Sequence, residues 1–215
     1  MSDDLVMAAT EWPTNAAMIA DVARLYFWDD DYNVLDCTFG KGAWWRCWRP
    51  NSLTASDLRA MPEPYANVMY CAGVDFREMP WTEECFDVVA FDPPYVSVGG
   101  RTTTGIGEMH AAYGMDGAPL SPQGVQDDID AGLAECFRVV KKGGIVLVKC
   151  QDYVSSGKLW PGTYLTLKAA YAVGFQLVDR LEHLSGPRPQ PEGRGPQKHA
   201  RRNYSTLFVL RRPRR

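Results

Sequence analysis

The sequence predicts an α/β fold in which helices cover both faces of a mostly parallel β-sheet. Before residue 186, runs with helical apolar spacing alternate with short apolar runs, which is typical of βαβ units. Phe86–Phe91 is apolar at every position except Asp87, as expected of a strand buried on both faces. With 215 residues, the chain is long enough for one domain with a full hydrophobic core. We therefore expect a single domain over 1–215.

The helices and turns follow from local patterns. Pro13 suits a first helical turn, and apolar residues recur at helical spacing from there to Phe27. A short strand at 33–38 leads into a glycine turn and then a tryptophan-rich segment, which we expect to be helical. The helix that begins at Ser121 is expected to end in a basic turn followed by Gly143 and Gly144.

The remaining elements complete an alternating pattern. A further helix is expected at 160–172, and the last two strands are expected to pair antiparallel at the edge of the sheet. The segments 95–120 and 186–196, rich in glycine with threonine or proline, are expected to be loops. The other expected strands are 52–56, 67–71, 86–91, 145–149, 175–178 and 205–210, the last followed by a basic tail to residue 215.

The basic residues are concentrated near the C-terminus. Residues 186–215 contain nine Lys and Arg and one acidic residue, a charge of +8. The remaining 14 basic and 25 acidic residues give the first 185 residues a charge of −11. Such a basic cluster predicts contacts with the phosphates of a nucleic acid, with a solvated tail as the alternative.

Composition excludes several other classes of protein. No apolar stretch is long enough to span a bilayer, and the N-terminus is acidic where a secretory signal would be basic, so we expect a soluble, cytoplasmic protein. The six cysteines are scattered, without a Cys-x-x-Cys pair or a neighbouring histidine. We therefore expect reduced, mostly packing cysteines and no metal site.

The first candidate motif is the turn Asp36-Cys37-Thr38-Phe39-Gly40-Lys41-Gly42, which follows the first strand. Ligands of open α/β sheets bind beyond the carboxyl ends of the strands. A carboxylate at such an end, followed by two glycines, allows the backbone to approach a ligand closely. The motif lacks the full dinucleotide and phosphate-loop patterns, so a plain tight turn is the alternative.

Two further acids follow the next two strands. Asp57 lies about 20 residues beyond the first motif, where an acid can accept both hydroxyls of a ribose. Asp75 and Phe76 offer an acceptor for an adenine amine beside an apolar surface for its ring. An ordinary exposed acid is the alternative at each position.

The most specific motif is Asp92-Pro93-Pro94-Tyr95, directly after the buried strand 86–91. An amine conjugated to a base ring is a poor nucleophile, so a site must orient its lone pair toward a methyl donor. The Asp92 side chain and the Pro93 carbonyl can act as two acceptors, because consecutive prolines restrict the backbone. Tyr95 supplies an aromatic face on which a base can stack. A strand that simply stops at a proline turn is the alternative.

Together these motifs resemble the class I S-adenosylmethionine-dependent amino-methyltransferases that modify adenine N6 and cytosine N4 in DNA. The resemblance covers about residues 12–180 and implies a Rossmann-like, seven-stranded, mostly parallel sheet with an antiparallel edge hairpin. It also implies S-adenosyl-L-methionine as the cofactor, with the segment 12–15 closing over its methionine carboxylate. The implied catalytic residues are Asp92, Pro93, Pro94 and Tyr95, and the implied cofactor-binding residues are Thr14, Asp36, Thr38, Phe39, Gly40, Gly42, Asp57, Asp75 and Phe76.

The chain departs from that family at two points. Lys41 stands in the glycine turn where family members usually have a small residue, and Phe39 and Trp44 make its rim aromatic. The chain also has no room for the separate target-recognition domain that sequence-specific DNA members commonly carry.

Substrate contacts are expected from loops, because a base inside a duplex must be flipped out to reach a strand-end pocket. The expected loops are 95–120, which contains Arg101, and 183–204, which contains Arg201 and Arg202.

Expectations for four single residues complete the predicted surface. Lys149 and Gln151 are expected to line the same cleft, with edge-strand solubility as the alternative. His183 and His199 are expected at the surface, since methylation of an amine with this motif requires no histidine base.

The leading hypothesis is methylation of adenine N6 in DNA, with cytosine N4 in DNA second and an RNA base amine third. The alternative from another class is a non-catalytic nucleic-acid-binding relative, against which the intact Asp92 and Tyr95 argue. The sequence leaves open a dimer and a partner that supplies target selection.

Overall fold

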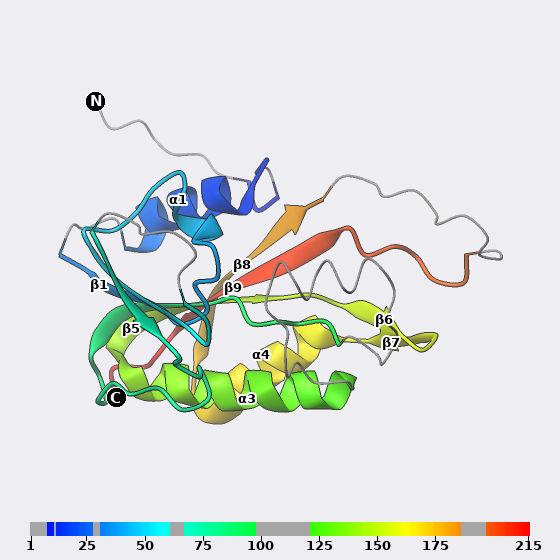
Figure 1. Cartoon of the computed structure of the whole chain (residues 1–215). Helices are drawn as coiled ribbons and strands as arrows, with labels where there is room; N and C mark the ends of the chain where they lie inside the picture. Colours follow the sequence, from blue (N-terminus) through cyan, green and yellow to red (C-terminus); the bar gives the residue numbers. More distant parts are fainter. Residues whose placement is uncertain (1–7, 11, 28–30, 61–66, 98–120, 186–196) are drawn as a thin grey trace.

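A seven-stranded sheet forms the centre of the molecule in the computed structural model, which describes residues 8–10, 12–27, 31–60, 67–97, 121–185 and 197–215 (Figure 1). The strand order is β3-β2-β1-β4-β5-β9-β8. The strands are β1 Asn33–Asp36, β2 Ser52–Asp57, β3 Val68–Ala72, β4 Phe86–Phe91, β5 Val140–Cys150, β8 Gln176–Leu184 and β9 Tyr204–Arg211.

Five of these strands, β1 to β5, are parallel, and β9 runs antiparallel between β5 and β8. The chain builds outward from β1 through β2 to β3, and then returns to the other side of β1 as β4. This reversal creates a topological switch point between β1 and β4, where ligands of open α/β sheets bind. The predicted parallel sheet and its antiparallel closing hairpin are confirmed.

Helices cover both faces of the sheet (Figure 1). Helix α1, Asn15–Tyr26, packs on one face over a core layer that includes Val88, Ala90 and Leu147. Helices α3, Pro122–Val139, and α4, Gly162–Val173, pack on the other face, over a layer that includes Val146 and Val148. Because side chains alternate along a strand, odd-numbered residues near the end of β5 face α1.

The tryptophan-rich segment after the glycine turn is not the α-helix expected from the sequence. It forms only one turn of 3-10 helix, η1, Ala43–Trp45. Trp44 and Trp45 turn inward and are about 95% buried, with exposed fractions of 5% and 4%. Pro50, shortly before β2, also prevents a long helix, since proline lacks the amide hydrogen that a helix interior needs.

The prediction that the helix beginning at Ser121 ends in a basic turn is also wrong. Helix α3 ends at Val139, and Val140 already has extended dihedral angles, so Lys141–Gly144 belong to β5. Val140 and Ile145, on either side of this segment, pair with β4, and Lys141 donates to Asp87 at 2.7 Å. Gly143 has a φ of +83° where the register with β4 shifts, a conformation that favours glycine.

Two short strands were not predicted. Strands β6, Tyr153–Ser155, and β7, Lys158–Trp160, form a hairpin beyond the end of β5, so α4 begins at Gly162 and not at 160. Among the described residues, no helix is both long and apolar enough to cross a membrane. All six cysteines are free thiols.

Candidate active site

The turns after β1 and β4 lie side by side at the switch point and are bonded to each other. The amide of Cys37 donates to the carbonyl of Ala90 at 3.1 Å. The amide of Asp92 donates to Thr38 Oγ1 at 2.7 Å. The glycine turn and the Asp-Pro-Pro-Tyr motif, whose first residues Asp36 and Asp92 are 56 positions apart, therefore form one structural unit.

Two left-handed glycines shape the first turn. Gly40 and Gly42 have φ values of +54° and +64°, which side-chain-bearing residues rarely adopt. The amide of Gly40 donates to Asp57 Oδ2 at 2.9 Å, and the amide of Phe39 donates to the carbonyl of Ser56 at 3.1 Å. These bonds fasten the turn to the end of β2. A Cβ added at Gly40 would meet only the Thr38 carbonyl oxygen, at 4.0 Å, so the turn opens onto free space.

Asp36 ends β1 as a buried carboxylate with an exposed fraction of 4%. Its Oδ1 accepts the amide of Thr38 at 3.0 Å, and its Oδ2 accepts Trp45 Nε1–H at 2.6 Å. Burial, with smaller contributions from the negative charges of Asp92 and Asp57, nevertheless raises the pKa of Asp36 to about 7. Asp92 and Asp57 therefore both lie within electrostatic reach of Asp36 at the glycine turn.

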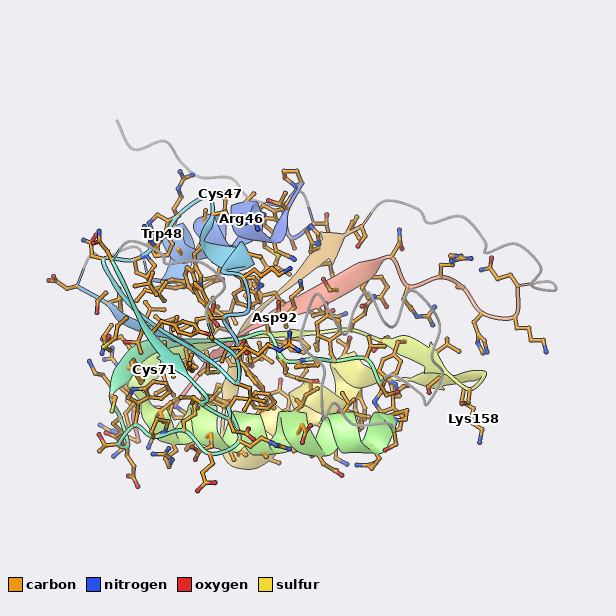
Figure 2. The ribbon with its side chains drawn as sticks, in the orientation of Figure 1. Arg46, Cys47, Trp48, Cys71, Asp92 and Lys158 are labelled. Carbon is orange, nitrogen blue, oxygen red and sulfur yellow. The ribbon has the colours of Figure 1, made fainter. Side chains whose placement is uncertain are left out.

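Asp92 is held by the other tryptophan of the same turn. Trp44 Nε1–H donates to Asp92 Oδ2 at 3.0 Å, while Oδ1 accepts no hydrogen bond from any residue that the structure describes. Burial raises the pKa of Asp92, and the positive charge of Lys149 and the Trp44 bond oppose that rise. In Figure 2, Asp92 lies between the layer of α1 and the layer of α3, near the centre of the molecule, whereas the exposed Lys158 lies at its periphery.

The rest of the motif differs in exposure along its length. Pro93 is buried and Pro94 is exposed. Tyr95 is partly buried and packs against the core layer on the α3 side. Its ring is thus supported from one side by the protein.

Asp57, after β2, and Asp75, after β3, differ in the groups that they bind. Each oxygen of Asp57 accepts one backbone amide, from Gly40 at 2.9 Å and from Arg59 at 3.2 Å. The carboxylate of Asp75 pairs with Arg77 at 2.6 Å, which lowers the pKa of Asp75. Phe76 packs edge to face on Phe91, with ring centroids 5.2 Å apart. Asp75 therefore already has a cationic partner.

Thr14 has a structural role at the start of α1. Its Oγ1 accepts the amide of Ala17 at 3.1 Å and caps the helix. Trp12, two residues earlier, donates from Nε1 to Asp21 of the same helix at 3.0 Å. This cap fixes the segment that we expect to close over the cofactor.

The structure corrects the expectations for Lys149 and His183. Lys149 lies on β5, an interior strand, and has an exposed fraction of only 4%, so edge-strand solubility does not explain it. His183 is partly buried, and its Nε2 is buried without a hydrogen-bond partner among the described residues. His199 is exposed as expected, with Nε2 2.9 Å from the carbonyl oxygen of Gly157.

The basic C-terminal segment is divided between opposite ends of the sheet (Figure 1). Arg201 and Arg202 precede β9 and lie at the carboxyl ends of the parallel strands, because β9 runs antiparallel to β5. Gln151 Nε2 donates to the carbonyl of Arg202 at 3.4 Å. The eight residues of β9 span about 26 Å. Arg211, Arg214 and Arg215 therefore lie at the far end, where they line a hollow with Lys141 and Lys142. Arg101 lies outside the described residues.

Two residues of the site were missed as site residues. The sequence predicts only an aromatic rim for Trp44 and no role for Trp45, although Trp45 donates to the buried Asp36 and Trp44 to the partly buried Asp92. Tryptophans eight and nine residues after Asp36 carry no sequence signal for these bonds.

Comparison with known proteins establishes the fold. No family model and no curated protein sequence matches this chain. A protein assigned as a methyltransferase from Bacillus halodurans aligns over 91% of this chain and 98% of its own length, with a TM-score of 0.55 and 16% identity. An S-adenosylmethionine-dependent methyltransferase from Methanosarcina mazei aligns over 95% and 99%, with a TM-score of 0.54 and 8% identity.

The 4+2 cyclase SpnF is similar to the same degree, with a TM-score of 0.55 and 14% identity over 92% of this chain and 81% of its own. The chain therefore has the Rossmann-like class I methyltransferase fold. Because a cyclase shares this fold, the reaction must be argued from the site.

Proposed function

We propose that this protein transfers a methyl group from S-adenosyl-L-methionine to an exocyclic amino group of a nucleic-acid base, with adenine N6 in DNA as the leading target. The observation that carries the proposal is the Asp92 carboxylate. It lies at the switch point, is anchored through Oδ2 by Trp44, and keeps Oδ1 without a bond to any described residue.

The residues around the glycine turn fit the cofactor by charge and by space. Asp36, Asp57 and Asp92 form a negative cluster beside an open turn, and neither Asp36 nor Asp92 forms an ion pair with a described residue. S-adenosyl-L-methionine is positively charged at its sulfonium sulfur and at its amino nitrogen, so it suits such a cluster. Asp57 is placed to accept ribose hydroxyls with its remaining lone pairs. When bound, the cofactor supplies an electrophilic methyl group.

The Asp-Pro-Pro-Tyr motif supplies what a planar amine lacks. An ionised Asp92 accepts one N–H of the target amine through Oδ1, and the Pro93 carbonyl is proposed to accept the other. Two acceptors draw the nitrogen out of conjugation and aim its lone pair. Tyr95 stacks on the base. The new N–C bond would form as the methyl–sulfur bond of the sulfonium breaks and leaves a neutral thioether. The nitrogen would become positive, and the adjacent Asp92 carboxylate would stabilise that charge and accept the proton.

The nucleic-acid part of the proposal is supported by charge at the correct end of the sheet. Arg201 and Arg202 lie at the strand ends that carry Asp92, while most of the chain is acidic. Contacts of Arg201 and Arg202 with phosphates would hold the polymer near the proposed site, whereas the basic residues at the far end of β9 lie away from it. We propose that Arg202, Arg201 and Arg101 position the polymer.

The decisive experiment incubates the purified protein with labelled S-adenosylmethionine and, separately, DNA, ribosomal RNA and transfer RNA. The modified nucleoside is then identified by mass spectrometry. N6-methyladenine in DNA is expected. N4-methylcytosine or a methylated RNA base would change the proposed target but would still support methylation of a base amine. Transfer to none of these polymers would refute the proposed enzyme.

A matched pair of variants tests the role of Asp92. Asp92→Ala is expected to abolish transfer while calorimetric titration still detects cofactor binding. Asp127→Ala, on the exposed side of α3, removes a carboxylate of the same type far from the turn and should leave transfer unchanged. Normal turnover by the Asp92 variant would disprove the catalytic assignment.

A further inference from the structure

Lys149 is a buried cation without an ion-pair partner among the described residues. It lies near the end of β5, and its flanking residues Val148 and Cys150 are completely buried. Its own exposed fraction is 4%, and no described carboxylate lies within ion-pair distance of its ammonium group. Burying an unpaired ammonium is strongly unfavourable, so its presence here calls for a compensating interaction.

The register between β4 and β5 places Lys149 next to Asp92. β4 and β5 are neighbouring strands, and their register pairs Phe91 with Val148, so the next residues along, Asp92 and Lys149, are neighbours. Both belong to the α1 side of the sheet, because Ala90 and Leu147, two residues earlier, lie in the core layer on that side. Consistent with this placement, the Lys149 charge opposes the upward shift that burial imposes on the pKa of Asp92.

In the strand order of the sheet, Asp92 follows a strand on one side of Lys149 and His183 belongs to a strand on the other side. It is on β8, two residues after Leu181, which belongs to the same core layer. Burial, with a second contribution from the Lys149 charge, lowers the pKa of His183, while a bond to the backbone of Pro13 opposes that effect. The lowered pKa favours the neutral imidazole, and its buried Nε2 has no hydrogen-bond partner among the described residues.

We propose that Lys149 is a positioning residue that keeps the Asp92 carboxylate ionised and able to accept the target amine, and that neutral His183 supports the Lys149 ammonium. The inference rests on the proposed function of Asp92. It assigns Lys149 to the carboxylate and not to the substrate polymer, which differs from the role expected from the sequence.

The charged groups around Asp92 set the direction of the effect. Asp36 on β1 and Asp92 repel each other when both are ionised, and Asp57 on β2 also raises the pKa of Asp36. Lys149 on β5 is the positive group that opposes protonation of Asp92, and the pKa of His183 on β8 is lowered. Without Lys149, Asp92 would bind a proton at higher pH. A protonated Asp92 would lose acceptor capacity, so methyl transfer would fail first at the acidic end.

A spectroscopic test reads Asp92 directly, without a substrate. Trp44 Nε1–H donates to Asp92 Oδ2, so the NMR resonance of this indole N–H should move as Asp92 titrates. Trp45 reports on Asp36 in the same way and serves as an internal reference. Trp44→Phe and Trp45→Phe assign the two resonances.

The variants are Lys149→Met, which keeps the length of the side chain without its charge, and Lys149→Arg, which keeps the charge. The Trp44 resonance in Lys149→Met is expected to titrate about one pH unit or more higher than in the unmodified protein, and Lys149→Arg should restore the original midpoint. Lys168→Met, an exposed lysine on α4, is the matched control and should not move it. An unchanged Trp44 midpoint in a folded Lys149→Met protein would overturn the proposal.

The transfer reaction gives a second readout. In Lys149→Met, kcat/KM is expected to fall at least tenfold near the acidic limb of its pH profile and to recover at high pH. An equal loss at every pH would indicate a merely structural role and would also overturn the proposal. If no nucleic acid is methylated by the unmodified protein, the proposed function fails, yet the Trp44 titration still decides whether Lys149 controls the ionisation of Asp92.

Discussion

Trp44→Phe should separate methyl transfer from cofactor binding. The substitution removes the 3.0 Å bond from Trp44 Nε1–H to Asp92 Oδ2 and keeps an aromatic ring in a position that is 95% buried, since the exposed fraction is 5%. A hydrogen bond to a charged group contributes about 1.5–3 kcal/mol. Each 1.36 kcal/mol corresponds to a tenfold change in rate, so kcat/KM is expected to fall about 10- to 150-fold.

The assay is single-turnover methyl transfer at saturating S-adenosylmethionine, combined with calorimetric titration of the cofactor. The loss should appear in the rate of transfer, with little change in cofactor affinity. Trp45→Phe is the matched variant, because it removes the equivalent 2.6 Å bond to Asp36. It should instead weaken cofactor binding. A Trp44→Phe protein that turns over at the normal rate would refute the view that this indole orients Asp92.

Two further predictions concern pH and salt. Burial raises the pKa of Asp36 from 3.8 to about 7, so the folded state holds its proton more tightly than the unfolded chain does. The resulting stabilisation is complete below about pH 4 and is lost as the pH rises through 7, a change on the order of 4 kcal/mol. Thermal unfolding of the ligand-free protein should show this decline, Asp36→Asn should flatten it, and an unmodified protein whose stability rises over that range would contradict it. For salt, replacing Arg201 and Arg202 with Gln should reduce the slope of log affinity for DNA against log salt by about 2, since each phosphate contact contributes about 0.9. The same change at Arg211 and Arg214, at the far end of β9, should leave the slope unchanged; equal effects of the two pairs would show that the polymer does not distinguish the two ends.

The sheet could be predicted because its strands are short apolar runs with clear boundaries. The strand Phe86–Phe91 has the bounds expected from the sequence, whereas the first strand ends at Asp36 and not at residue 38. Since parallel strands bring their carboxyl ends to one edge, acids after different strands could be expected to meet. Asp36, Asp57 and Asp92 do so, as their mutual effect on the pKa of Asp36 shows.

The predictions failed where strand pairing and strand direction, rather than the local residue pattern, determined the structure. Lys141–Gly144 has the composition of a helix end, but pairing of the flanking Val140 and Ile145 with β4, and backbone bonds of Gly143 and Gly144 to Arg212, make it part of a strand. The basic residues of the tail form one cluster in sequence and two in space. The antiparallel direction of the last strand, itself predicted, already implies that division, because a strand carries its two flanks to opposite ends of the sheet.

The sequence by itself determined the class of fold, the edge of the sheet where a ligand would bind, and the motif Asp92-Pro93-Pro94-Tyr95. These features depend on residue type and on order along the chain, which apolar periodicity and strand-end rules translate directly. Only the tertiary structure decided the partners of Asp92. Trp44 reaches it because two left-handed glycines turn the chain inward, and Lys149 is buried beside it because β9 inserts between β5 and β8. Both effects depend on strand order and backbone direction between segments far apart in the chain, and no local pattern of residues carries that information.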